Sequence, residues 1–153
     1  MNLGLMRERI TTTPLSQQLP ENMRDRFIMA LLYVADTEEV TRTQELFRKG
    51  EADTDRGCLI LEGMVRIKTE KDDKKTIEAP DILGEVQLFT PQGTRTATVE
   101  VVVGGEILTF SWKDFGHCAK SLYSPEEMQT LKKIIADSAW AREEHLRERL
   151  GLK

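Results

Sequence analysis

Hydrophobic and polar positions follow three different spacings along the chain. In the first segment, apolar residues recur three or four positions apart after Pro20: Met23, Phe27, Ala30 or Leu31, and Val34. This spacing predicts a helix that packs one face against a core and turns Arg24, Asp25 and Arg26 to water. The helical character extends to about residue 40. The run of threonines before Pro14 should interrupt structure, so we expect residues 1–20 to be a loose N-terminal extension and 21–153 one domain.

Between about residues 41 and 112 the spacing changes to two. An apolar run at 57–61 stops at Glu62-Gly63, and Val65, Ile67 and Thr69 then alternate with charged residues. A polar tip at 71–74 and a segment at 76–79 predict a returning strand. Further along, 98–103 is β-branched, Gly104-Gly105 supplies a turn, and 106–112 is the expected partner strand. Short strands with no helix between them indicate an antiparallel sandwich or barrel.

The third spacing belongs to one long helix, about 125–150. Ser124 is its expected N-cap, with Pro125 at the first helical position and Glu127 completing a capping box; Gly151 follows its last apolar residue. One apolar stripe runs along it: Met128, Leu131, Ile135, Ala139, Leu146 and Leu150. Because such a helix is longer than a small barrel, we expect part of the stripe to contact a second subunit or to cover a site.

Composition narrows the function. The 153 residues carry 22 Lys plus Arg against 26 Asp plus Glu, a net charge of -4, which argues against a nucleic-acid-binding body. No apolar run reaches the roughly 20 residues of a membrane span, and the N-terminus lacks the apolar core of a signal peptide. Cys58 and Cys118 form no CxxC pair, which favours a reducing cytoplasm, and His117 and His145 leave little material for a metal site.

The segment 80–97 resists a purely structural explanation. A single helical turn starting near Glu85 would present unpaired backbone N–H groups, which attract an anion. Arg95 follows at loop distance and has the planar fork that grips a phosphate, and the hydroxyl of Thr96 adds a third donor. The carboxylate of Glu85 accepts protons only and suits a sugar hydroxyl. One short segment therefore combines a phosphate clamp with a sugar acceptor.

These residues carry a resemblance. Gly84-Glu85-Val86-Gln87-Leu88-Phe89, followed by Arg95-Thr96-Ala97, resembles the phosphate-binding cassette of cyclic-nucleotide-binding domains, with the spacing of the bacterial catabolite activator type. Three further segments match the family in order: the glycine turn at 46–51, the hairpin-like motif at 59–65, and the strand and aromatic end at 106–115. The resemblance covers about residues 20–150. It implies a mainly β protein, an antiparallel β-roll of the jelly-roll kind with an N-terminal helix and a long C-terminal helix.

The resemblance also implies the site. Glu85 would accept the ribose 2′-hydroxyl, Arg95 would neutralise the cyclic phosphate, and Thr96 with the amides of Gly84 and Glu85 would complete its shell, with Ala97 closing the motif. The C-terminal helix would close over the base through Ser138, Trp140 or Arg142 as candidate lid residues. The ligand would be cAMP, favoured by the bacterial spacing, or cGMP, which a hydroxyl after the arginine also suits.

Three readings of the function remain open. The first is a stand-alone cytoplasmic sensor without catalytic activity, which signals through its C-terminal helix, a homodimer along that helix and an effector protein that the sequence does not identify. The second is a degenerate, ligand-free roll, with Glu85 and Arg95 paired to each other, that serves as a dimerisation module. The third is a small-barrel metalloenzyme, which the sequence disfavours because both histidines lie outside the strand zone. We expect no DNA-binding helix-turn-helix after the long helix, and these 153 residues contain no P-loop, GxSxG or HExxH motif.

Overall fold

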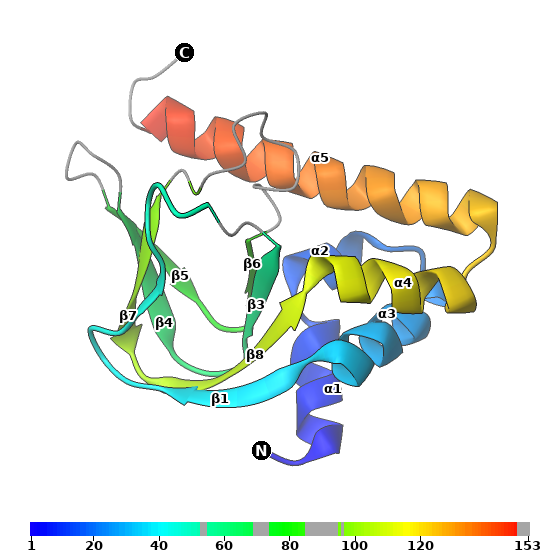
Figure 1. Cartoon of the computed structure of the whole chain (residues 1–153), viewed down its shortest axis with the longest axis horizontal. Coiled ribbons are helices and arrows are strands. Elements are labelled where there is room, and N and C mark those ends of the chain that lie inside the picture. Colours follow the sequence, from blue (N-terminus) through cyan, green and yellow to red (C-terminus); the bar gives the residue numbers. More distant parts are fainter. Residues whose placement is uncertain (53–54, 69–73, 85–94, 96, 150–153) are drawn as a thin grey trace.

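Two antiparallel sheets face each other in the computed structural model; most helices gather at one end, and the long C-terminal helix runs past the sheets (Figure 1). The structure describes residues 1–52, 55–68, 74–84, 95 and 97–149. The first sheet has the strand order β1 (Asp36–Val40), β8 (Gly105–Ser111), β3 (Arg56–Ile60) and β6 (Asp81–Leu83). The second has the order β2 (Glu45–Phe47), β7 (Thr98–Val103), β4 (Met64–Lys68) and β5 (Lys74–Glu78). The predicted β-roll with flanking helices is confirmed.

Strand β3, inside the first sheet, is buried on both of its faces. Cys58 and Ile60 of β3 point into the roll, where they join a core completed by the second sheet with Val65, Ile67, Ile77, Val99 and Val101. Leu59 of the same strand points the other way, into a second core shared with the helices. Two buried faces require apolar residues at consecutive positions, which explains the continuous apolar run at 57–61. The second sheet is buried on one face only, so buried and partly exposed residues alternate along β4.

Only one of the predicted strand pairings is a true hairpin. β4 and β5 pair as expected, with Met64 opposite Glu78 and Lys68 opposite Lys74. β7 and β8 lie in different sheets, so the prediction that they pair with each other is wrong, and the 59–65 motif likewise links two sheets. A Cβ on Gly104 would come within 2.7 Å of the Val40 carbonyl oxygen, and one on Gly105 within 2.7 Å of the Glu62 carbonyl oxygen. These glycines therefore serve close backbone approaches where the chain crosses between sheets.

The N-terminal segment is helical, which corrects the expectation of a loose start. Helix α1 spans Leu3–Thr11 and α2 spans Pro14–Gln18, with the Thr13 hydroxyl capping α2. Ile10, Leu15 and Leu19 are buried in the helical core. The threonines do separate two helices, as predicted, but apolar residues on both sides of the break anchor them. The division at residue 20 stays a prediction.

The predicted amphipathic helix is α3 (Glu21–Val34), which buries Met23, Phe27 and Leu31. It ends earlier than expected, because β1 begins at Asp36 and pairs with β8. β1 has four exposed residues before Val40, so its pattern gives no period-two signal. Its place in the sheet comes from backbone pairing rather than from side-chain burial.

Two helices follow the strands. The first, α4 (Trp112–Leu122), was not predicted; the Ser111 hydroxyl caps it by accepting from the Asp114 amide at 3.1 Å. The second, α5 (Pro125–Arg149), confirms the predicted long helix. Its capping box is present, because the Glu127 amide donates to the Ser124 hydroxyl at 3.1 Å and the Ser124 amide donates to the Glu127 carboxylate at 3.0 Å. In the described part of the chain, no helix is long and apolar enough to cross a membrane.

The start of α5 is tied to α3 by one arginine. The guanidinium of Arg26 donates to both carboxylate oxygens of Glu127, at 2.9 and 2.5 Å, and to the Leu122 carbonyl at 3.1 Å. It also lies over the ring of Tyr123, whose hydroxyl donates to the Met23 carbonyl. The prediction that Arg26 faces water is therefore wrong. Its contacts fix the turn between α4 and α5 against α3.

The apolar stripe of α5 is partly buried at Met128 and fully buried over its next three members. Leu131, Ile135 and Ala139 have exposed fractions of 1, 6 and 1 %. Leu131 and Ile135 pack against the same core as α3 and α4. The later members of the stripe, Leu146 and Leu150, and the expected cap Gly151 lie outside the described side chains.

Candidate functional site

Arg95 is a charged residue buried inside the protein, with 4 % of its surface exposed. Its backbone is held by the loop after β2, because the Gly50 amide donates to the Arg95 carbonyl at 2.8 Å and the Arg95 amide donates to the Glu51 carbonyl at 3.0 Å. Gly50 has a φ of +88°, a backbone conformation that glycine adopts most readily. The predicted glycine turn thus positions the predicted anion-binding arginine.

The guanidinium of Arg95 lies across the ends of β3 and β6. Its Nη2 donates to the Arg56 carbonyl at 2.6 Å, and Nη1 points to the Gly84 carbonyl at 3.4 Å. The ring of Phe47 lies beneath, with 4.1 Å between its centroid and the Arg95 Cζ. Carbonyl oxygens and an aromatic face all favour the positive charge of the guanidinium at this buried position. We call Phe47, Arg56, Gly84 and Arg95 the arginine cradle.

Gly84 is required by the geometry of the cradle. Its φ is +98°, and a Cβ at this position would lie 2.8 Å from the Arg56 carbonyl oxygen. The same Cβ would approach the Arg95 Nη1 and the Phe47 ring to 3.3 Å. Any other residue would be strained and would displace the groups that orient Arg95.

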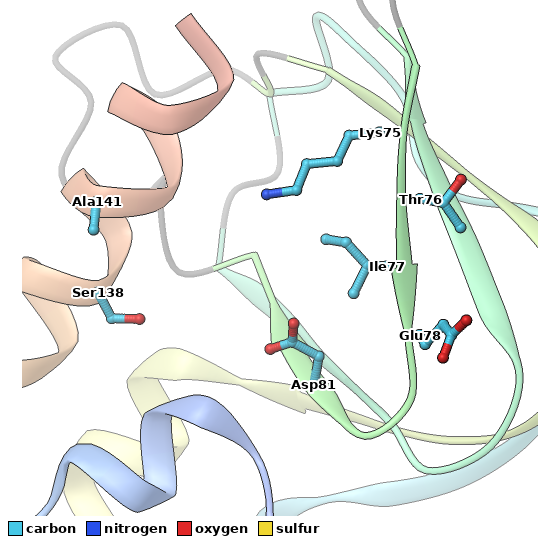
Figure 2. Close-up of a pocket in the computed structure, with 7 residues that line it drawn as sticks. All are labelled: Lys75, Thr76, Ile77, Glu78, Asp81, Ser138 and Ala141. Carbon is cyan, nitrogen blue, oxygen red and sulfur yellow. The ribbon is translucent and has the colours of Figure 1, made fainter. Parts of the chain in front are cut away.

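A cavity of about 430 Å³ opens between β5, the start of β6 and α5 (Figure 2). Most of the residues that line it have polar side chains, and all seven are Lys75, Thr76, Ile77, Glu78, Asp81, Ser138 and Ala141. Lys75 and Ile77 lie two residues apart on β5 and both point toward α5. A cation, a carboxylate and a hydroxyl therefore face one space that is large enough for a small organic ligand.

The predicted site residues fall into two groups. The structure brings Gly84 and Arg95 into contact, places Ala97 against the core of the roll, and puts Ser138 on the cavity wall. Glu85 and Thr96 lie outside the described residues, so the expected sugar and phosphate contacts and the alternative Glu85–Arg95 pair stay predictions. Trp140 and Arg142 lie on α5, but their side chains are outside the described part.

Four residues near the site were not predicted from the sequence: Phe47, Arg56, Lys75 and Asp81. Lys75 lies between the predicted tip at 71–74 and the predicted strand at 76–79, yet its spacing of two from Ile77 places it on the inward face of β5. That spacing was visible in the sequence. The roles of Phe47 and Arg56 were not, because they meet Arg95 only through the packing of distant segments.

The free thiol of Cys58 points into the roll but takes no part in the site. It is fully buried, and burial raises its pKa to about 12. The thiol is therefore protonated at neutral pH and inert. The part of the chain that the structure describes contains no cluster of three or more His, Cys, Asp or Glu residues that could hold a metal ion.

Comparison with known proteins defines the class. The model of the cyclic nucleotide-binding domain matches residues 37–121, from β1 to α4, and the chain belongs to this family. Domains of this family are regulatory rather than catalytic. A search of curated proteins found no match.

Solved structures of low sequence identity share the fold. The structure described as "Sp-2Cl-cAMPS bound to PKAR CBD2" has 14 % identity and a TM-score of 0.70, covering 98 % of this chain and 94 % of that one. The sensor domain of the transcriptional regulator DNR from Pseudomonas aeruginosa has 19 % identity and a TM-score of 0.65, with coverages of 93 and 95 %. The catabolite activator protein of Thermus thermophilus has 21 % identity and a TM-score of 0.63; the match covers 90 % of this chain and 62 % of that protein.

Proposed function

We propose that this chain is a cytoplasmic regulatory domain that binds a 3′,5′-cyclic nucleotide in its roll, with Arg95 neutralising the cyclic phosphate. The observation that carries the proposal is the arginine cradle. Two backbone carbonyls and an aromatic ring hold the buried guanidinium in one orientation. Binding an anion therefore costs it little hydration and little conformational freedom. Because the chain is acidic overall, attraction of the ligand must come from such local groups.

The remaining contacts follow from the family motif. Glu85 takes the ribose 2′-hydroxyl, and Thr96 with the amides of Gly84 and Glu85 completes the phosphate shell beside Ala97. The base extends toward the cavity at β5, where Ser138 lies on the wall. Ser138, Trp140 and Arg142 are the candidate lid residues on α5.

Among purine cyclic nucleotides we propose cAMP first and cGMP second. The interval from Gly84 to Arg95 matches the bacterial catabolite activator type, and two structures similar to this chain are described as bound to a cAMP analogue and to cAMP. The hydroxyl of Thr96 also suits guanine. No metal is needed for this binding.

The output of the domain would pass through α5. A nucleotide that contacts both the roll and α5 binds the closed arrangement better and so shifts the population toward it. A homodimer along the apolar stripe of α5 and an effector protein would then read the position of the helix. The alternative, a ligand-free roll that acts only as an interaction module, would leave the arginine cradle without a purpose.

The test is calorimetric titration with cAMP, cGMP and linear 5′-AMP. We expect saturable binding of a cyclic nucleotide, with 5′-AMP weaker. Arg95→Ala should weaken binding by about 1.5–3 kcal/mol, the value of charge-assisted hydrogen bonds. Arg42→Ala, which removes an exposed loop arginine, is the matched control and should bind as the wild type does. If neither cyclic nucleotide binds to the wild type, the interaction-module alternative replaces this proposal.

A further inference from the structure

A second cavity, of about 420 Å³, lies between α4 and α5, and none of its lining residues lines the cavity at β5. Its walls are apolar: Trp112 and Phe115 come from α4, and Met128, Leu131 and Ile135 come from α5. We call it the α4–α5 groove. Its volume and apolar walls are typical of small-molecule sites.

Gly116 keeps this groove open. It lies inside α4, where glycine weakens a helix, and it lines the groove. A Cβ added at Gly116 would meet no atom within 4 Å. At Gly57, by contrast, an added Cβ would lie 2.5 Å from the Phe110 ring, so packing requires a glycine there. No neighbour in the described structure requires Gly116, and its effect is to leave space in the groove.

The rim of the groove is positively charged. Lys113 on α4 and Lys132 on α5 are exposed and line the groove, and in the described residues neither forms an ion pair. Asp55 also lines it, but its carboxylate already accepts from the Ser111 hydroxyl at 2.5 Å and from the Lys113 amide at 3.0 Å. The rim therefore carries two ammonium groups against one carboxylate, a net positive charge that favours a small anionic group, while the groove below offers apolar contacts.

We propose that the α4–α5 groove binds a small amphiphile with an apolar chain and a single carboxylate, such as a medium-chain fatty acid. The carboxylate lies between Lys113 and Lys132, and the chain lies against Trp112 and the apolar residues of α5. Neutral and cationic amphiphiles of the same chain length lack the charge complementarity and bind more weakly.

Binding in the groove is coupled to the cavity at β5, because α5 contributes to both. Ile135 lines the groove, and Ser138, three residues further on, lines the cavity at β5. A ligand that holds α5 in one position changes the affinity at the other site, and the effect is reciprocal. This coupling rests on the proposed function, whereas binding in the groove does not.

The experiment titrates the full chain, free of nucleotide, with sodium decanoate below its micelle concentration, and with decanol and decyltrimethylammonium as controls. We expect saturable one-site binding of decanoate with a rise in melting temperature. Decanol and decyltrimethylammonium should bind at least about tenfold more weakly. Replacing both lysines, Lys113→Gln with Lys132→Gln, should weaken decanoate about tenfold and leave decanol unchanged.

Gly116→Leu should abolish decanoate binding by filling the groove, without lowering the melting temperature of the free protein. Gly4→Leu, at a glycine in α1 whose added Cβ has only an ordinary 3.5 Å contact, is the matched control and should still bind decanoate. Non-saturable binding by the wild type, or full binding by Gly116→Leu, would overturn the proposal. Nucleotide affinity with and without decanoate then tests the coupling alone, so failure of nucleotide binding leaves the result for the groove unaffected.

Discussion

The arginine cradle and the cavity at β5 lie at opposite ends of the short strand β6, and they are built in different ways. In the cradle, backbone carbonyls and amides position Arg95, and Gly84 makes the fit possible. The cavity is lined by side chains of β5 and β6 on one side and by α5 on the other. A site built from backbone is set once the roll folds, whereas a wall supplied by a helix changes when that helix moves. We infer that the cradle sets affinity and the cavity sets selectivity and response.

The largest effect on stability and nucleotide affinity should come from distorting the arginine cradle while Arg95 itself is kept. Gly84→Ala forces a non-glycine residue into positive φ and brings its Cβ to 2.8 Å from the Arg56 carbonyl oxygen. We expect a loss of about 1–3 kcal/mol in the free energy of unfolding and at least a tenfold loss of cyclic-nucleotide affinity. Urea denaturation and calorimetry measure the two quantities.

Gly116→Ala is the control for this change, because it adds the same methyl group inside a helix with open space around it. It should be neutral or stabilise by up to about 1 kcal/mol. Equal destabilisation by both changes would contradict the role assigned to the cradle.

A smaller effect is expected in the cavity. Lys75 donates hydrogen bonds only, and guanine presents two adjacent acceptors, N7 and O6, where adenine presents one acceptor and an amino group. Lys75→Met should therefore lower the affinity for cGMP several-fold more than that for cAMP. Competition between the two nucleotides measures the ratio, and Lys49→Met, at an exposed lysine of the glycine turn, is the control. An unchanged ratio would remove Lys75 from base recognition.

The smallest effect concerns the fixed end of α5. Hydrogen bonds from Arg26 and from the Ser124 backbone lower the pKa of Glu127 from 4.5 to about 2. Because the folded pKa lies below the ordinary value, this stabilisation is complete above about pH 4.5 and disappears as the pH falls through about 2. Melting temperatures of wild type and Glu127→Gln should differ most above pH 4.5 and converge toward pH 2.

Glu126→Gln is the matched control, since Glu126 is the exposed neighbour in the same helical turn. A pH profile for Glu127→Gln that parallels that of the wild type would show that the contact between Arg26 and Glu127 does not anchor α5. Such a result would weaken the contrast between the fixed start of α5 and its later turns, which line the cavity.

Some of these features could be predicted from local pattern alone. The start of α5 follows from Ser124, Pro125 and Glu127, because capping is a contact between near neighbours. The β4–β5 hairpin follows from alternation around a polar tip. Helix α4 was not predicted, because its first residue, Trp112, continues the apolar run of β8. Strand β1 was not predicted either, because most of its side chains are exposed.

The sequence by itself determined three things: the elements that have a local signal, the family motif, and the place of Arg95 in that motif. Only the tertiary structure decided which strands share a sheet, that Phe47 and Arg56 support Arg95, and that Lys75 faces α5. The physical reason is the range of the interactions. Periodicity and capping act within a few residues, whereas the contact between Arg95 and the Arg56 carbonyl joins positions 39 apart, and no local pattern records such a pairing.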